Sequence, residues 1–225
     1  MKIRKVKIKK DKKNDITKSG YYNVFGVKEL AELCRKIQST TIRNGNELQD
    51  IILSEVTVQK LSKKIDLDSL IKLINSGSTF YIANYRISKS QLESKGIKLS
   101  GKKNIDIDAI FCKDKILYII EYKQGDNLDT KKSQSEVESL SKVSEFFKSL
   151  EIETCPKLVM WVCDDVKNSS IKTTENKEFL ITGKEACDII GLSFESIENI
   201  RKSDQEDNIN FIFEEVDRIK LLISK

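Results

Sequence analysis

Two carboxylates and a lysine occur in this sequence at a spacing that could build a hydrolytic site. Twelve residues separate Asp108 from the triplet Glu121-Tyr122-Lys123. Successive side chains of a strand point to opposite faces, so Glu121 and Lys123 would share one face while Tyr122 points away. Carboxylate oxygens select a hard ion such as Mg²⁺, which polarises a phosphate and lowers the pKa of a bound water. A neighbouring lysine can orient that water, or deprotonate it if its own pKa is lowered. These residue types together suit the hydrolysis of a phosphodiester.

A hairpin of two strands is the element that would bring these residues together. Residues 104–111 alternate in polarity and then become apolar, and 116–120 form a continuous apolar run that ends at Glu121. Pairing the two strands through the polar turn between them would place Asp108 close to Glu121. Asp106 points to the same face as Asp108 and competes with it for the metal role, and the spacing favours Asp108. Ionised groups at the end of a buried strand need partners, which a divalent cation and a lysine would supply.

The segments around this hairpin predict an α/β fold with a mixed β-sheet core flanked by helices. A helix over 133–150 with one apolar face is followed, after Pro156, by an apolar strand over 157–163. The order strand, strand, helix, strand implies a crossover helix packed on a mixed sheet. Nothing marks a domain boundary, so 1–225 is expected to be a single nuclease domain with a basic N-terminal arm at about 1–20. Further predictions are a strand at 79–87, a short strand at 6–9, and helices at 27–38, from 47, at 66–75, at 183–190 and at about 210–223.

The composition excludes several kinds of chemistry. The chain has no histidine, which removes Ser/His and Cys/His nucleophilic catalysis and nucleases with a histidine base. None of the five cysteines forms a Cys-x-x-Cys pair, so nothing indicates structural zinc. The net charge of +5 is mild, and the basic arm is either a solvated terminus or a contact for phosphate. With no signal peptide and no membrane-length apolar window, the protein is expected to be cytoplasmic and without a membrane partner.

The spacing of Asp108 and Glu121-Tyr122-Lys123 resembles the PD-(D/E)xK nuclease superfamily. Its signature is an aspartate on one strand and (Asp/Glu)-x-Lys on the next, and Ile107 stands here where the superfamily's name has proline. The resemblance implies that Asp108 and Glu121 hold the metal, that Lys123 serves the water, and that the backbone carbonyl of Tyr122 adds a metal ligand.

The same resemblance implies a further site residue, a glutamate upstream of Asp108. Many members of the superfamily carry a glutamate on an early helix that faces the metal site, and Glu47 in the segment 44–50 matches that element. Asn44 and Asn46 stand where a helix cap belongs, so the dipole of a helix that begins there would equally favour Glu47 in its first turn. Both interpretations of Glu47 stay open at this point.

Two stretches point to a narrower group. Residues 121–133 resemble type II restriction endonucleases, and 180–187 are similar to a C-terminal segment in some of them. This resemblance implies a restriction-endonuclease-like fold and a Mg²⁺-dependent enzyme, with Mn²⁺ as a possible substitute, that cuts double-stranded DNA at a specific sequence. A palindromic site requires two-fold symmetry, so a homodimer is expected. A cognate DNA methyltransferase would belong to the same system without direct contact. The alternatives are a structure-specific repair or recombination nuclease, such as a junction resolvase, and a non-catalytic DNA-binding module.

Overall fold

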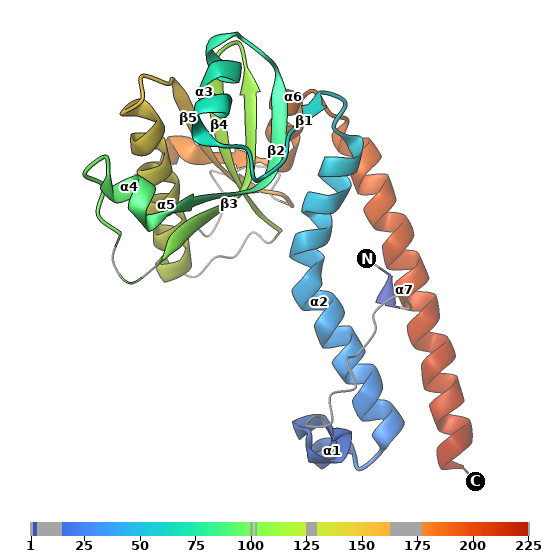
Figure 1. The fold of residues 1–225 in the computed structure, drawn as a ribbon. Helices are drawn as coiled ribbons and strands as arrows, with labels where there is room; N and C mark the ends of the chain where they lie inside the picture. Colours follow the sequence, from blue (N-terminus) through green and yellow to red (C-terminus); the bar gives the residue numbers. More distant parts are fainter. Residues whose placement is uncertain are drawn as a thin grey trace. The chain divides into compact units, whose positions relative to one another are not determined.

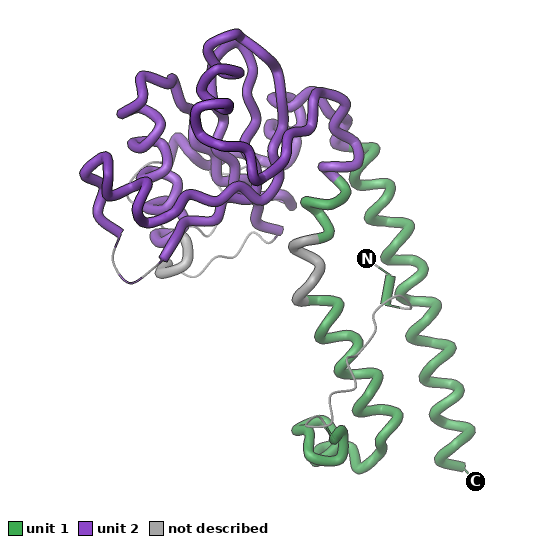
Figure 2. Tube along the Cα trace, in the orientation of Figure 1, with its two compact units in different colours: residues 1–51, 195–225 green, residues 52–194 purple. Residues whose placement is uncertain are grey.

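A computed structural model describes residues 2–3, 15–99, 101, 103–124, 130–162 and 177–224, without the side chains of 42–46 and 130–133. The chain divides into two compact units, Met1–Ile51 with Glu195–Lys225 and Ile52–Phe194 (Figure 2). The predicted single nuclease domain stays a prediction, because compact units of this kind need not fold independently. Most of the basic arm, including the predicted strand at 6–9, lies outside the described residues.

The second unit is built on one mixed sheet (Figure 1). Its strand order among the described residues is β1-β2-β3-β4-β5-β6. Pairing is antiparallel from β2 to β4 and parallel between β1 and β2 and from β4 to β6. This arrangement confirms the predicted α/β class. The strands are β1 (Gln59–Lys60), β2 (Phe80–Ser88), β3 (Asn104–Lys113), β4 (Ile116–Lys123), β5 (Thr154–Met160) and β6 (Leu180–Thr182).

Strands β3 and β4 form the predicted hairpin. The register runs from Lys113↔Ile116 to Ala109↔Ile120, so one further step along both strands sets Asp108 opposite Glu121. The two residues of the turn, Asp114 and Lys115, have φ angles of 53° and 65°. Both positive angles match a two-residue turn whose twist suits the flanking strands. The turn therefore fixes the register that brings the two carboxylates together.

Among its described residues, the second unit also contains the helices α3 (Leu67–Asn75), α4 (Lys89–Glu93), α5 (Thr130–Lys148) and α6 (Gly183–Ile190). Helix α5 is the predicted crossover, and its residues Val143, Phe146 and Phe147 are at most 1% exposed. Thr182 caps α6 through a capping box with Glu185. A large apolar core lies between α5 and the sheet.

The strand after α5 differs from its prediction. It begins at Thr154, before Pro156, and ends at Met160 instead of continuing to residue 163. The reason is pairing, because β5 follows β4 from Leu117↔Thr154 to Lys123↔Met160 and loses its partner where β4 ends. Cys163 itself lies outside the described residues.

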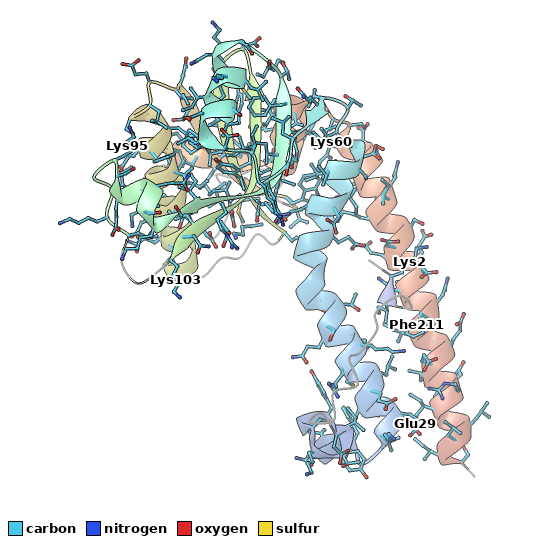
Figure 3. The ribbon with its side chains drawn as sticks, in the orientation of Figure 1. Lys2, Glu29, Lys60, Lys95, Lys103 and Phe211 are labelled. Carbon is cyan, nitrogen blue, oxygen red and sulfur yellow. The ribbon has the colours of Figure 1, made fainter. Side chains whose placement is uncertain are left out.

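The first unit contains α1 (Gly20–Phe25) and most of two long helices, α2 (Lys28–Glu55) and α7 (Phe194–Ile223). One cluster of buried residues in this unit contains Ile3, Leu33, Phe211 and Ile219, and Figure 3 labels Phe211 on α7. Lys2 lies 3.9 Å from carboxylate oxygens of both Asp204 and Asp207 on α7. Within the described residues, none of the helices is both long enough and apolar enough to cross a membrane.

Two helix predictions in this unit were wrong. The predicted break before Glu47 is absent, because α2 runs without interruption through the segment 44–46. Asn and Gly cost at most about 1 kcal/mol each inside a helix, and the burial of Leu48 and Ile52 offsets that cost. Helix α7 begins at Phe194 instead of about residue 210, because buried Ile197 and an ion pair between Arg201 and Glu198 support its early turns.

Candidate active site

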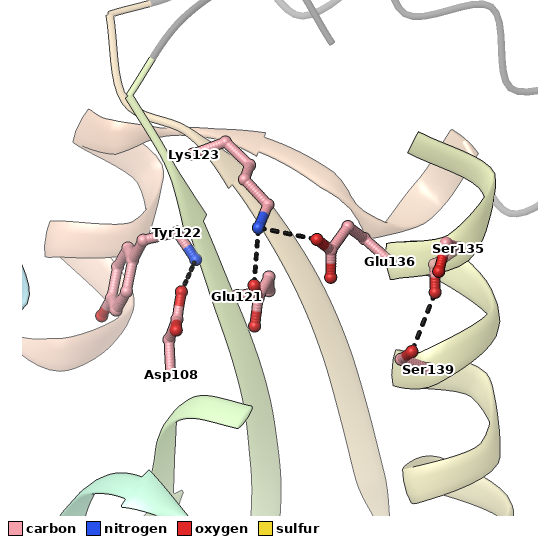
Figure 4. Close-up of polar contacts among 7 residues, drawn as sticks. All are labelled: Asp108, Glu121, Tyr122, Lys123, Ser135, Glu136 and Ser139. Atoms are coloured by element: carbon pink, nitrogen blue, oxygen red, sulfur yellow. Dashed lines mark hydrogen bonds and ion pairs between the residues drawn. The ribbon is translucent and has the colours of Figure 1, made fainter. Parts of the chain in front are cut away.

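Glu121 and Lys123 lie at the end of β4, on the face of the sheet that α5 covers (Figure 4). The apolar run of β4 carries Glu121 into the protein, where the residue is 8% exposed. The Nζ atom of Lys123 lies 2.6 Å from Oε1 of Glu121 and 3.0 Å from Oε1 of Glu136 on α5. The predicted pairing of Glu121 with Lys123 on one strand face is therefore present in the structure.

Asp108 reaches the same place from β3. Its Oδ2 atom accepts a hydrogen bond of 2.8 Å from the backbone N–H of Tyr122. On the other side of β3, the register contains Ala83↔Ala109 and Tyr85↔Ile107, while Asn84 between these pairs has a φ angle of 55°. A left-handed residue interrupts the regular extended backbone of a strand, so the sheet departs from regular pairing next to Asp108.

Tyr122 fixes the end of β4 through its side chain and its backbone. The side chain is 6% exposed and packs edge-on against Trp161, with 6.4 Å between the ring centroids. The N–H and C=O of a strand residue point to the same neighbouring strand. Because the N–H of Tyr122 reaches Asp108, the carbonyl of Tyr122 is also directed toward the β3 side.

Negative charge is in excess at this site. Burial, together with the negative charge of Asp108, raises the pKa of Glu121 to about 7 against the opposing effect of Lys123. Burial alone would lower the pKa of Lys123, but the carboxylates of Glu121 and Glu136 outweigh burial and raise it. The neighbouring carboxylates raise both pKa values, whereas burial raises that of Glu121 and opposes the rise for Lys123. The carboxylates therefore favour the protonated form of Lys123, which can donate hydrogen bonds.

The donor set fits a hard divalent cation. The described residues contain no group of three or more histidine, cysteine, aspartate and glutamate side chains with metal-ligand geometry. Asp108 and Glu121 would therefore supply two side-chain oxygens and Tyr122 a backbone oxygen, with waters completing the shell. Mg²⁺ characteristically keeps several waters and binds through one or two carboxylates. A cation here would also offset the cost of a buried, ionised Glu121.

Asp106, the competing candidate, lies in different surroundings. Its Oδ1 atom is 2.6 Å from Nε of Arg86, and its Oδ2 atom accepts a hydrogen bond of 3.1 Å from the side chain of Asn104. Its side chain is 60% exposed. These contacts with Arg86 and Asn104 favour Asp108 over Asp106 as the partner of Glu121.

Glu47 lies in the interior of α2, in the first unit. It lines a cavity of about 200 Å³ together with residues of the same unit that include Thr40, Arg201 and Asp204. The helix dipole favours glutamate in the first turn of a helix, but α2 begins at Lys28, well before Glu47. The dipole therefore does not account for a glutamate at this position. Its predicted catalytic role stays a prediction.

The sequence reasoning missed Glu136. The apolar face of α5 was predicted from residues such as Val137 and Leu140, and Glu136 lies one turn before Leu140 on the buried side. A charged residue at helical spacing with Leu140 and Val143 is the signal that could have identified it. A charge on a buried helix stripe requires a partner, and Lys123 supplies one.

A mixed α/β sheet that holds two carboxylates and a lysine at one strand end suits metal-assisted hydrolysis. A comparison with curated proteins narrows the class to type II restriction enzymes. The chain is 31% identical over 207 residues to the type II restriction enzyme HhaII of Haemophilus parahaemolyticus, and the match covers 89% of each chain. The chain therefore belongs to the family of type II restriction endonucleases, which are DNA-cleaving hydrolases. No protein-family model and no solved structure matches the chain.

Proposed function

We propose that this protein is a Mg²⁺-dependent endonuclease of the PD-(D/E)xK type, with Asp108, Glu121 and Lys123 at its catalytic centre. One observation carries the proposal. A buried glutamate with a pKa raised to about 7 lies beside Asp108 and within 2.6 Å of a lysine. This combination of burial and like charge is characteristic of functional sites and unfavourable for stability alone.

Each residue has a distinct part in the proposed mechanism. Asp108 and Glu121 would hold the cation, and the backbone carbonyl of Tyr122, the residue after Glu121, would add a third oxygen. When bound, a divalent cation polarises the phosphate and acidifies a water. Lys123, which is protonated in this arrangement, donates hydrogen bonds that orient the attacking water and stabilise negative charge on the phosphate. Burial of Glu121 excludes bulk water and strengthens these electrostatic interactions.

The proposed substrate is double-stranded DNA with a specific recognition sequence. HhaII is a type II restriction enzyme. We extend the proposal to a cognate DNA methyltransferase that belongs to the same system and does not contact this protein. Cutting both strands of a palindrome calls for two active centres related by two-fold symmetry, so we extend the proposal to a homodimer. Size-exclusion chromatography with light scattering measures this directly, and a monomer with and without DNA would contradict it.

Plasmid cleavage tests the proposed activity. The protein is incubated with supercoiled plasmid and Mg²⁺, with EDTA as the control, and the products are separated on a gel. Discrete fragments that disappear with EDTA are the expected result. Cleavage confined to branched DNA would favour a repair nuclease instead. A folded protein that cuts nothing with Mg²⁺ or Mn²⁺ would refute the activity.

A further inference from the structure

The ammonium of Lys123 is shared between two carboxylates from different elements. Glu121 comes from the same strand, at 2.6 Å, and Glu136 comes from α5, at 3.0 Å (Figure 4). The side chains of Lys123, Glu121 and Glu136 are 21%, 11% and 31% exposed. An ammonium has three donors, so both carboxylates can hold Lys123 at once.

The two acceptors differ in what a metal would do to them. On the proposed function, Glu121 gives its oxygens to a divalent cation, and the charge of that cation repels the nearby ammonium. Lys123 would then lose its closest acceptor. A lysine has a long flexible stem and a strongly hydrated head, so an ammonium without an acceptor readily turns toward solvent. Glu136 is outside the proposed metal ligand set and would remain available to Lys123.

The backbone of Glu136 is held firmly. The next residue on α5, Val137, is 5% exposed, and Leu140, one turn later, is 1% exposed. Both belong to the apolar core between α5 and the sheet. A carboxylate on a helix fixed by its own packing can keep a flexible partner in place.

We infer that Glu136 is a positioning residue that retains Lys123 in the active site when the metal takes Glu121. This inference rests on the proposed role of Glu121 as a metal ligand. It assigns α5 a part in catalysis in addition to its part in the core. Glu136 itself touches neither the metal nor the phosphate in this account and acts only through Lys123.

Amine labelling measures the position of Lys123 without any cleavage. The full chain is treated with N-hydroxysuccinimidyl acetate, with and without Mg²⁺ and without DNA, and acetylation of Lys123 is quantified by mass spectrometry. In the natural protein, Lys123 is expected to stay protected in both conditions, because at least one carboxylate holds it in each. In Glu136→Gln, it is expected to stay protected without Mg²⁺ and to be labelled several-fold faster with Mg²⁺.

Labelling of Lys123 that requires both the Glu136→Gln substitution and Mg²⁺ distinguishes a positioning role from a general structural role. A merely structural Glu136 would expose Lys123 in the variant whether or not Mg²⁺ is present. Exposed Glu138 provides the matched control, because two positions along a helix place it on nearly the opposite side. Glu138→Gln is expected to label like the natural protein. Protection of Lys123 in Glu136→Gln with Mg²⁺ would overturn the inference, as would equal labelling with and without the metal.

Single-turnover cleavage with saturating Mg²⁺ provides the second measurement. Glu136→Gln is expected to slow cleavage by roughly 10- to 100-fold, as other residues that orient active-site groups do, with unchanged affinity for DNA. Glu136→Asp keeps the charge and should be faster than Glu136→Gln, and an Asp variant slower than the Gln variant would overturn the inference. If the natural protein cuts nothing, the proposed function fails, while the labelling result still decides the role of Glu136.

Discussion

Two ion pairs of equal length lie on the same sheet and have different consequences. Lys123 and Glu121 on β4 are 2.6 Å apart, and so are Arg86 on β2 and Asp106 on β3. The side chains of the first pair are 21% and 11% exposed, whereas those of the second are 66% and 60% exposed. Distance therefore does not distinguish the two pairs, but burial does.

The difference separates the pair of the proposed active site from an ordinary surface pair. An exposed pair has a median worth of about 0–1 kcal/mol, because water screens it and ordering two long side chains costs entropy. The buried pair also faces Asp108 and Glu136, so three carboxylates surround one ammonium in this cluster. Such a cluster is costly to the fold and attracts a cation, which is the property a metal-dependent enzyme uses.

The largest expected effect comes from a matched pair of substitutions on β3. Asp108→Asn should slow Mg²⁺-dependent cleavage by at least about 10³-fold, because several kcal/mol of metal-mediated transition-state stabilisation is lost. Asp106→Asn, two residues away, should change the rate by less than about threefold, because its partner is the exposed Arg86. Single-turnover rates on one DNA substrate measure both. A reversed order would assign the metal to Asp106.

Stability as a function of pH gives an effect of intermediate size. The pKa of Glu121 is raised from 4.5 to about 7, so the fold favours its protonated form. The resulting stabilisation is present below pH 4.5 and is lost as the pH rises through about 7. This shift corresponds to at most about 3 kcal/mol. In EDTA, the free energy of unfolding in urea should therefore fall between about pH 4.5 and pH 7, and Glu121→Gln should remove this loss.

The addition of Mg²⁺ is a second test of the charge on Glu121. Mg²⁺ binds the ionised form of Glu121, so it should stabilise the natural protein more at about pH 8 than at about pH 5. Glu121→Gln should abolish most of this difference. Equal stabilisation of the natural protein and the variant by Mg²⁺ would place the ion elsewhere.

The smallest expected effect belongs to the exposed pair. Arg86→Ala should lower the free energy of unfolding by less than about 1 kcal/mol, and added salt should reduce the loss further. Urea unfolding at low and high salt measures both quantities. A decrease of more than about 2 kcal/mol in the free energy of unfolding would show that the exposed pair is not weak, and that exposure does not account for the difference between the two pairs.

Local patterns were sufficient to predict the hairpin and the proximity of Asp108, Glu121 and Lys123. The apolar run before Glu121, the polar turn at Asp114 and the strand alternation to Lys123 each act over a few residues, and the structure has all three. The choice between Asp106 and Asp108 rested on spacing alone. Their surroundings differ through Arg86, which belongs to a distant part of the sequence.

Features that depend on packing between distant segments could not be predicted in this way. The continuity of α2 through Gly45 depends on the burial of residues such as Leu48, which outweighs a local break signal. The early start of α7 depends on Ile197 and Arg201 in a largely polar stretch with little apolar periodicity. The ion pair between Glu136 and Lys123 depends on the packing of α5 beside the end of β4.

Substitution of Lys123 tests the central claim most directly. The natural protein and Lys123→Ala are compared for plasmid cleavage with Mg²⁺ and for DNA binding with Ca²⁺, with Lys142→Ala on α5 as the control. The account predicts that Lys123→Ala binds DNA with nearly natural affinity and yields no discrete fragments, while Lys142→Ala cuts normally. Fragments from Lys123→Ala at the natural rate would contradict the assignment of the active site.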